Sequence, residues 1–181
     1  MQSMVNSELD LRKYIREIPD YPIKGVNFKD ITTLIKDKDA FAYTIDKMSE
    51  PFLDRNIDKL VLIEARGFAF SAIARNLDCG VVLVRKPNKL PCETISASYE
   101  KEYGRDTLEM HKDSISKGDR VLVVDDLLAT GGTVGAAIEL VERSGGIVEG
   151  LSFVVDLPFL GGSQNLSRNY RVNSLISYDS E

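Results

Sequence analysis

Four short runs of apolar residues constrain the fold of this chain more than any other feature. They are Leu60–Ile63, Val81–Val84, Val121–Val124 and Ile147–Val155. A strand with one wet face alternates polar and apolar side chains, whereas a strand covered on both faces is apolar almost throughout. We therefore expect these runs to be strands of a parallel sheet covered on both faces, with Val172–Ile176 as a fifth strand.

Segments with helical spacing lie before and between these runs. They are Ser7–Glu17, Phe41–Leu53, Phe68–Asn76 and a stripe formed by Val134, Ala137, Ile138 and Val141. The last helix is expected to end at Gly145-Gly146, because glycine accepts the left-handed cap conformation. Strands that alternate with helices predict an α/β fold whose ligand binds at the carboxyl ends of the strands.

The segment between Asn88 and Lys117 has a different character. Its hydroxyl and charged residues show no persistent period, and an irregular segment of this length is usually functional or disordered. We predict a mobile flap over Thr94–Gly104, within residues 94–106.

Composition narrows the classes of protein. A length of 181 residues predicts a single domain, residues 1–181, and a net charge of −5 disfavours a protein that coats nucleic acid or a membrane surface. Met1–Leu9 lacks the apolar core of a signal peptide, and no apolar run is long enough to span a bilayer. Cys79 and Cys92 form no C-x-x-C pair, and the single His111 leaves no His-rich metal cluster or Ser/His/Asp signature. We therefore expect a cytoplasmic protein with reduced thiols and no nucleic-acid or membrane partner.

The segment Val121–Thr133 carries the clearest chemical signal. A buried strand ends in Asp125 and Asp126, and a loop rich in threonine and glycine then leads into a helix. The free N–H groups and positive dipole of a helix N-terminus suit a monophosphate, and glycines let the backbone approach it closely. Carboxylates beside such a cradle can accept hydrogen bonds from sugar hydroxyls, so the segment predicts a ribose 5-phosphate site.

The alternative for this segment is a capped helix after a strand-end turn, which would be equally acceptable for an isolated T-G-G-T. The two adjacent aspartates favour the ribose phosphate site. No G-x-x-x-x-G-K-[ST] or helix-opening G-x-G-x-x-G occurs, which disfavours ATPase and dinucleotide-binding classes.

The same segment resembles the signature of type I phosphoribosyltransferases, and motifs elsewhere narrow the resemblance to the adenine branch of that family. These motifs are, in chain order, Ile18–Pro22, Gly25–Ile31, Glu64–Phe68, Val84–Pro91, Ser98–Tyr99, Glu102–Gly104, Leu157–Leu160 and Ser174–Ile176. The resemblance extends from about Ile15 to Tyr178. It implies a type I phosphoribosyltransferase fold, with a five-stranded parallel sheet flanked by helices, a small N-terminal hood (mainly residues 1–35) and a homodimer. The implied reaction converts adenine and 5-phosphoribosyl 1-pyrophosphate (PRPP) to AMP and pyrophosphate. It uses Mg²⁺ that is bound mainly through PRPP or pyrophosphate, without dedicated protein ligands.

The resemblance also implies roles for the hood and the flap. The backbone of Asn27 would read the edge of adenine, Phe28 would stack on the base, and Lys29 stands where arginine is common. In the flap, Glu102 would act as the catalytic acid or base, and Tyr103 would help to bind substrate. The alternatives are a core phenylalanine for Phe28 and an exposed surface carboxylate for Glu102.

Further implied roles fall on the larger part of the chain. Arg66, with Gly67, would hold pyrophosphate and act in catalysis, with Asp126. The other expected substrate contacts are Arg85, Lys86, Lys89, Asp125, Ala129, Thr130, Gly131, Gly132 and Thr133. The alternative for the basic residues is a solvated loop. Ala65 replaces the serine that is usual before Arg-Gly, which removes a hydroxyl but keeps the backbone donors.

Two rival functions stay open at this point. One is a phosphoribosyltransferase for a 6-oxopurine, which the hood and the Glu102–Gly104 motif disfavour. The other is a PRPP-sensing regulator on the same fold. Such a protein usually carries an added DNA-binding module and a basic surface, for which this chain shows no spare segment.

Overall fold

The computed structural model describes residues 9–100 and 104–180. The chain divides into two compact units, an N-terminal unit that extends to Thr44 and a larger unit from Ile45 to Ser180. The units are described separately below, and the single-domain organisation stays a prediction.

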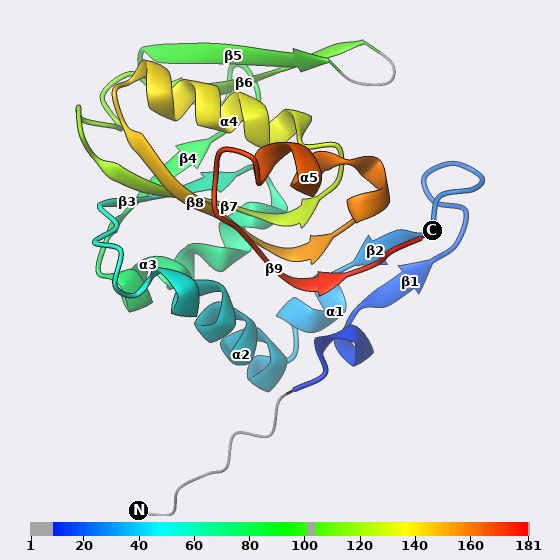
Figure 1. Cartoon of the computed structure of the whole chain (residues 1–181). Helices are drawn as coiled ribbons and strands as arrows, with labels where there is room; N and C mark the ends of the chain where they lie inside the picture. Colours follow the sequence, from blue (N-terminus) through cyan, green and yellow to red (C-terminus); the bar gives the residue numbers. More distant parts are fainter. Residues whose placement is uncertain (1–8, 101–103, 181) are drawn as a thin grey trace, which may run out of the picture. The chain divides into compact units, whose positions relative to one another are not determined.

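A five-stranded parallel sheet forms the centre of the larger unit (Figure 1). Its strands are β3 (Lys59–Ile63), β4 (Gly80–Val84), β7 (Arg120–Leu128), β8 (Ile147–Asp156) and β9 (Val172–Ser177). Their spatial order is β4-β3-β7-β8-β9, and all neighbours are parallel. Val121–Val124 is fully buried within β7, as expected for a strand covered on both faces. The five predicted strands are therefore confirmed.

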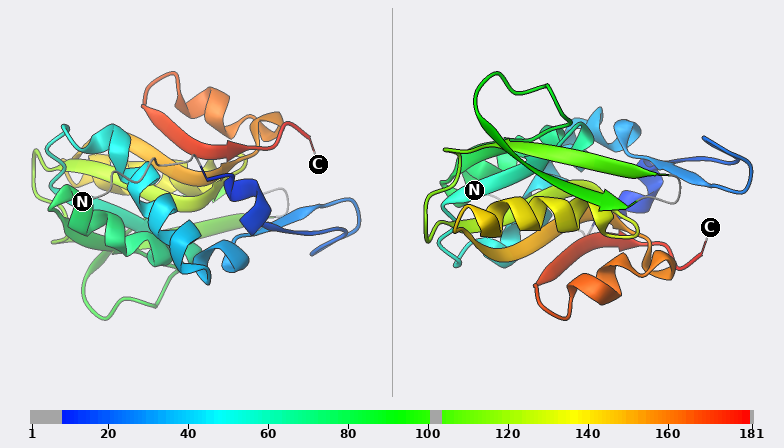
Figure 2. Two further views of the ribbon diagram at one scale, coloured as in Figure 1. Left: turned by 90° about the horizontal axis from the view of Figure 1, so that it is seen from below. Right: turned by 90° about the horizontal axis from the view of Figure 1, so that it is seen from above.

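Helices cover both faces of this sheet. Helix α4 (Gly132–Arg143) lies on one face, and α3 (Ile73–Leu77), which follows the 3-10 segment Arg66–Ala72, lies on the other (Figures 1 and 2). Between β8 and β9 the chain forms a 3-10 turn (Pro158–Leu160) and the short helix α5 (Gly162–Leu166). The predicted helix over Phe68–Asn76 is thus found as a 3-10 segment that continues into α3.

An antiparallel hairpin packs on the outer side of α4 (Figures 1 and 2). It consists of β5 (Thr94–Glu100) and β6 (Arg105–His111), which pair from Thr94↔His111 to Glu100↔Arg105. The expectation of an irregular segment is therefore wrong for Thr94–Glu100. Ile95, Ala97 and Tyr99 pack into or against the core while their neighbours face away, a period of two that identifies a half-buried strand. The mobility of the predicted flap stays a prediction.

The N-terminal unit contains a smaller antiparallel pair, β1 (Arg16–Ile18) and β2 (Phe28–Asp30), preceded by a 3-10 turn (Leu11–Tyr14). Helix α1 (Thr32–Ile35) follows, and α2 (Lys38–Ser49) and the 3-10 turn Glu50–Phe52 lead out of the unit. The helix predicted over Phe41–Leu53 is therefore confirmed with shifted ends.

The helix predicted over Ser7–Glu17 is wrong. Leu11 and Ile15 are buried, as the apolar spacing required, but the chain then extends so that Arg16 pairs with Asp30 and Ile18 with Phe28. Pairing with a distant strand therefore overrides a local helical period.

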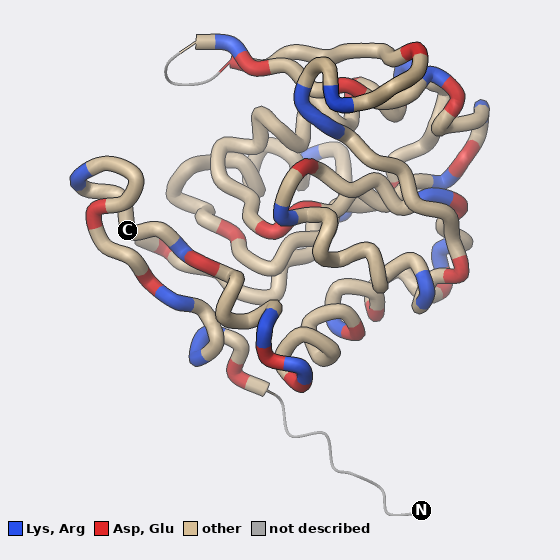
Figure 3. Tube along the Cα trace, turned by 180° about the vertical axis from the view of Figure 1, so that it is seen from behind, with Lys and Arg blue, Asp and Glu red and all other residues tan. Residues whose placement is uncertain are grey.

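Charged side chains of both signs are distributed along the chain. In the view of Figure 3, Lys and Arg (blue) alternate with Asp and Glu (red) along many segments. Within the described part of the chain, every helix is too short or too polar to cross a membrane.

Candidate active site

A cavity of about 550 Å³ opens at the carboxyl ends of β3 and β7. It is lined by Glu64, Ala65, Arg66, Lys86, Tyr99, Asp106 and all residues from Asp125 to Val134. The cavity thus brings together many of the predicted site residues, namely Arg66, Lys86, Asp125, Asp126, Ala129, Thr130, Gly131, Gly132 and Thr133. Its position agrees with the expectation that ligands of parallel α/β sheets bind at the strands' carboxyl ends.

The two aspartates lie within the last part of β7, which continues to Leu128, and they are almost fully buried, with Asp125 9% and Asp126 4% exposed. Asp126 accepts a hydrogen bond from Arg66 Nε and forms an ion pair with it. The backbone N–H of Asp126 donates to Asp125 Oδ1 at 2.8 Å. Burial, and next the charge of Asp126, raise the pKa of Asp125 well above its usual range. The pair therefore holds less negative charge than two ordinary carboxylates.

Gly67 allows the chain after β3 to pass directly against the aspartates. A Cβ atom at this position would lie 3.0 Å from Asp125 Oδ1 and 3.2 Å from the carbonyl oxygen of Val124. Gly67 is buried behind Arg66 and does not line the cavity. The peptide bond between Glu64 and Ala65, two residues upstream, is cis.

The loop after the aspartates forms a cradle of backbone donors, which we call the phosphate cradle, residues 129–133. Gly131, at a φ of 86°, is the N-cap of α4, and this left-handed conformation favours glycine. The first N–H groups of α4 have no partner inside the helix and are available to an anion. Gly132 lets Tyr99 of β5 approach, since a Cβ atom at Gly132 would lie 3.0 Å from Tyr99 Cδ2.

The predicted basic cluster is only partly on the cavity wall. Lys86 lines the cavity, whereas Arg85 and Lys89 are not among the lining residues. Arg85 Nη2 donates to Glu64 Oε1 at 2.8 Å, and the N–H of Lys86 donates to Glu64 Oε2 at 2.9 Å. The hydrogen bond from Arg85 lowers the pKa of Glu64 despite burial. Arg85 therefore supports this wall of the cavity through Glu64.

Seven lining residues had no predicted role as substrate contacts, and three of these, Glu64, Tyr99 and Asp106, carry a carboxylate or hydroxyl group. Tyr99 lies opposite Asp106 in the hairpin, and its hydroxyl donates to Asp106 Oδ2 at 3.3 Å. The alternation of apolar and polar residues over Thr94–Glu100 would have placed Tyr99 on the inner face of a strand. Glu64 directly follows β3, and Asp125 lies near the end of the neighbouring strand β7. This shared position was the sequence signal that Glu64 would lie at the same edge of the sheet.

The hood residues belong to the N-terminal unit. Asn27 Nδ2 and Lys29 Nζ donate to Glu17 Oε2 of β1 at 2.6 and 2.8 Å. Lys29 is only 4% exposed, and its hydrogen bond lowers the pKa of Glu17. The ring of Phe28 meets that of Tyr21 edge to face, with 5.3 Å between centroids. Phe28 is half-buried, so its other contacts do not enclose it as a core residue.

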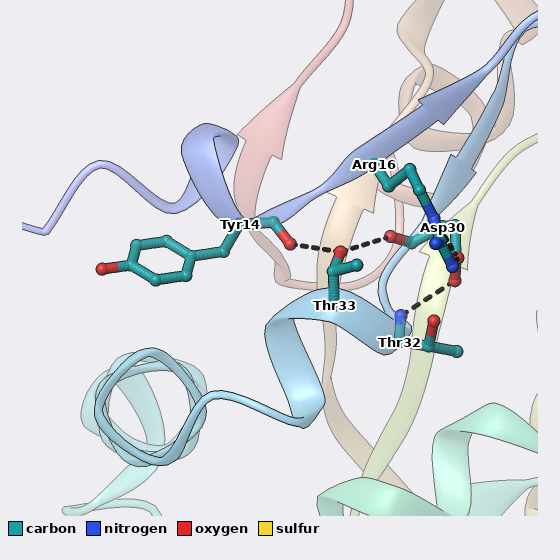
Figure 4. A network of polar contacts seen from close by, with 5 residues as sticks. All are labelled: Tyr14, Arg16, Asp30, Thr32 and Thr33. Carbon is teal, nitrogen blue, oxygen red and sulfur yellow. Dashed lines mark hydrogen bonds and ion pairs between the residues drawn. The ribbon is translucent and has the colours of Figure 1, made fainter.

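A second polar network fixes the β1–β2 pair and α1 (Figure 4). Asp30 Oδ2 accepts from Arg16 Nη2 at 2.5 Å and from its Nε at 3.1 Å, while Asp30 Oδ1 accepts from the N–H of Thr32 at 2.9 Å. The Thr33 hydroxyl donates to the carbonyl oxygen of Tyr14 at 2.6 Å. Each of the predicted base contacts in the hood therefore lies on or beside a cross-linked strand. The predicted flap residues Glu102 and Tyr103 lie outside the described residues.

Known proteins match this chain over most of its length. The phosphoribosyl transferase domain matches residues 27–151. An adenine phosphoribosyltransferase of Koribacter versatilis is 56% identical over 170 residues, which cover 93% of each chain. One of Brachyspira hyodysenteriae is 54% identical over 171 residues, which cover 94% of this chain and all of that protein.

Solved structures agree with these relatives. The adenine phosphoribosyltransferase of Thermoanaerobacter pseudethanolicus has a TM-score of 0.89 at 50% identity, covering 93% of this chain and 98% of that one. The Saccharomyces cerevisiae enzyme, solved with adenine and an imino-altritol bisphosphate, has a TM-score of 0.85 at 39% identity, covering 91% and 96%. With a type I fold, the predicted cavity and these relatives, the chain belongs to the adenine phosphoribosyltransferase family of phosphoribosyltransferases.

Proposed function

We propose that this protein transfers the 5-phosphoribosyl group of PRPP to N9 of adenine, which yields AMP and pyrophosphate and salvages the purine base. The observation that carries the proposal is the cavity in which Asp125, Asp126 and Arg66 lie beside the phosphate cradle. The names of the relatives and the ligand of the Saccharomyces cerevisiae structure support adenine as the base.

The 5-phosphate of PRPP fits the phosphate cradle. There the N-terminal N–H groups of α4 and the hydroxyls of Thr130 and Thr133 line the cavity beside Gly131 and Gly132. A helix N-terminus favours an anion by its dipole and its unpaired donors. The ribose hydroxyls would then donate to the Asp125 and Asp126 carboxylates, which begin the same stretch of lining.

The pyrophosphate of PRPP fits the opposite wall, where Arg66 and Lys86 line the cavity. Planar guanidinium groups match phosphate oxygens, and a lysine adds a compact positive charge. We expect Arg66 to exchange some of its interaction with Asp126 for the incoming phosphate. Arg85 and Lys89, which lie outside the lining, would act through Glu64 or on a neighbouring subunit.

Mg²⁺ also fits this donor set. The cavity offers carboxylate oxygens, the ligands that Mg²⁺ prefers, and a cation beside Asp125 would offset the burial and the neighbouring charge of Asp126 that raise the pKa of that group. The ion would be held mainly by PRPP oxygens, with Asp125 and Asp126 as the protein donors beside them. When bound, Mg²⁺ neutralises charge on the departing pyrophosphate.

The transfer breaks one bond and forms another at C1 of the ribose. The C1–O bond breaks with its electron pair leaving on pyrophosphate, and the N9 lone pair of adenine then forms the new bond to C1. The proton lost from adenine passes to Glu102, for which we retain the role of acid or base. Positive charge that grows on the ribose lies near Asp125 and Asp126, while Arg66 and Lys86 stabilise the leaving group.

Adenine would be held by the hood. We propose that Phe28 stacks on the base, as aromatic rings do on purines, and that the backbone at Asn27 reads its edge. Lys29 is held inside the hood by Glu17 instead of presenting a planar fork, so we expect it to contribute charge and not a bidentate contact.

The test is a spectrophotometric assay of the purified chain with PRPP, Mg²⁺ and each of adenine, hypoxanthine, guanine and xanthine. AMP formed from adenine, with the 6-oxopurines at least ~10²-fold slower, is the expected outcome, because a site built to bond one edge rejects the other. Preference for a 6-oxopurine would assign the chain to the sister activity. PRPP binding without turnover of any base would favour a PRPP-sensing regulator.

We further propose a homodimer in the cytoplasm. Two free cysteines, Cys79 and Cys92, suit a reducing compartment. Light scattering coupled to size exclusion should give twice the chain's mass of 20.1 kDa, and a monomeric, fully active enzyme would contradict the assembly.

A further inference from the structure

The segment that follows β8 lies directly behind the phosphate cradle, although no residue of it lines the cavity. The N–H of Gly162, the first residue of α5, donates to the carbonyl oxygen of Ala129 at 3.1 Å. Just before this turn, the N–H of Leu157 donates to the carbonyl oxygen of Leu128 at 2.9 Å. Two backbone hydrogen bonds therefore join this segment to the end of β7 and to the start of the loop that leads into α4.

The contact at Gly162 leaves no room for a side chain. A Cβ atom there would lie 2.2 Å from the carbonyl oxygen of Ala129, 2.9 Å from the nitrogen of Gly131 and 2.9 Å from the carbonyl carbon of Thr130. All three are backbone atoms, so no rotamer change can relieve the clash. From the other side, a Cβ atom at Gly131 would lie 3.4 Å from Gly162 Cα and 3.3 Å from Leu166 Cδ1. Two backbones thus abut through a pair of glycines.

The segment is anchored, so it can act as a support. The N–H of Gly161 donates to the carbonyl oxygen of Pro158 at 2.9 Å, which closes the turn. The side chain of Ser163 lies near the buried Asp156 at the end of β8, where it lowers the pKa of that carboxyl against the larger opposing effect of burial. Leu166 packs against the core cluster of the sheet. A side chain added at Gly162 would therefore displace the cradle, because the segment behind it is fixed to β8 and the core.

We propose that Gly162 is a positioning residue that braces the phosphate cradle and so fixes the N–H groups that receive the 5-phosphate. The N–H of Gly162 also donates a hydrogen bond to the carbonyl oxygen of Ala129. This bond holds the oxygen away from the cavity, where it would repel an anionic ligand. This inference rests on the proposed function for the identity of the ligand, a sugar 5-phosphate. A displacement of about 1 Å in a binding or catalytic group can lower the reaction rate by about 10²-fold. Loss of the contact at Gly162 should therefore weaken binding of the 5-phosphate and slow turnover.

The test compares Gly162→Ala with a matched glycine replacement, Gly135→Ala. Gly135 lies in α4 with open space around its position and no positive φ, so an added methyl should be tolerated. Titration calorimetry would measure binding of ribose 5-phosphate, which carries the 5-phosphate, and of pyrophosphate, which does not. We expect Gly162→Ala to weaken binding of ribose 5-phosphate by about 10–100-fold while binding of pyrophosphate stays within about twofold. Gly135→Ala should match the wild type for both ligands.

A second variant keeps the test decisive if Gly162→Ala does not fold. Leu166→Ala retains the backbone and removes the side chain that contacts the position of Gly131, so binding of ribose 5-phosphate should weaken in the same direction. Unchanged ribose 5-phosphate affinity in a folded Gly162→Ala protein, or in Leu166→Ala if only that variant folds, would overturn the brace. Equal losses for both ligands would also overturn it. Because binding is measured without turnover, a wild type that binds ribose 5-phosphate but makes no AMP would instead contradict the proposed function.

Discussion

The carboxylate of Asp30 should make a measurable, pH-dependent contribution to stability. Its two oxygens accept hydrogen bonds from Arg16 and from the N–H of Thr32, and the side chain is only 10% exposed (Figure 4). Burial raises the pKa of Asp30, but the hydrogen bonds from Arg16 and Thr32 outweigh it and lower the pKa from 3.8 to about 2. The Asp30→Asn variant removes this ionised acceptor with little change in shape.

The magnitude follows from the pKa. At about 1.36 kcal/mol for each pKa unit, the fall from 3.8 to about 2 corresponds to about 2.4 kcal/mol. Water around the half-exposed Arg16 screens part of this, so we expect Asp30→Asn to lower the free energy of unfolding by about 1–2 kcal/mol near neutral pH. Because the folded-state pKa of Asp30 lies below the unfolded value, the stabilisation is complete well above pH 3.8 and is lost as the pH falls through about 2.

Urea unfolding followed by far-UV circular dichroism at pH 6, 5, 4 and 3 would measure the effect. The difference between wild type and Asp30→Asn should be largest at pH 6 and fall to about half at pH 3. Asp113→Asn, at an exposed carboxylate in the turn after β6, should change stability by less than about 0.5 kcal/mol. A wild-type advantage over Asp30→Asn that is equally large at pH 3 and pH 6 would refute the reasoning.

Four further substitutions probe the proposed chemistry. Arg66→Ala and Asp126→Asn should each lower kcat/KM by about 10²–10³-fold. Because the two side chains form one ion pair, the loss in the double variant, measured by steady-state kinetics, should be smaller than the product of the two single losses. Intact turnover in the double variant would contradict both roles. Phe28→Ala should raise the KM for adenine about 10-fold or more with little change in the KM for PRPP, since stacking on a base is worth ~1–3 kcal/mol; equal rises in both constants would exclude stacking. Glu17→Gln should lower the melting temperature and raise the KM for adenine, because the carboxylate anchors two hood side chains. Glu93→Gln, in an exposed ion pair, is its matched control and should change neither quantity.

The central sheet could be predicted from sequence because strands that are buried on both faces are continuous runs of apolar residues. Each residue of Val121–Val124 is fully buried, so each must be apolar, and no knowledge of the neighbouring strands is needed to read that requirement. The phosphate cradle could be predicted for a similar reason. Its aspartates, glycines and threonines are contiguous, and all of Asp125–Thr133 lines one cavity.

The elements that were predicted wrongly depend on distant partners. Arg16–Ile18 is a strand because it pairs with Phe28–Asp30. The apolar spacing around Arg16–Ile18 does not indicate this partner, so the sequence favoured a helix. The different positions of Arg85 and Lys86 also depend on a residue distant in the sequence. Glu64, more than twenty residues earlier, binds the guanidinium of Arg85 and leaves Lys86 on the cavity wall.

The charges around the cavity explain how an acidic lining can receive an anionic substrate. Among the described residues, the lining carries four carboxylates and two cationic side chains: Glu64, Asp106, Asp125, Asp126, Arg66 and Lys86. Asp126 is paired with Arg66, and Glu64 accepts from Arg85 behind the wall. Burial and the neighbouring charge raise the pKa of Asp125, so this group resists ionisation until a positive charge approaches. In the proposed reaction, Mg²⁺ supplies part of this positive charge, and more develops on the ribose as the bond to pyrophosphate breaks. The phosphate cradle, in contrast, offers neutral N–H and hydroxyl donors to the 5-phosphate of the proposed substrate. In the proposed reaction, the charge of Asp125 would therefore increase as positive charge develops on the ribose, and such differential stabilisation of the transition state raises the rate.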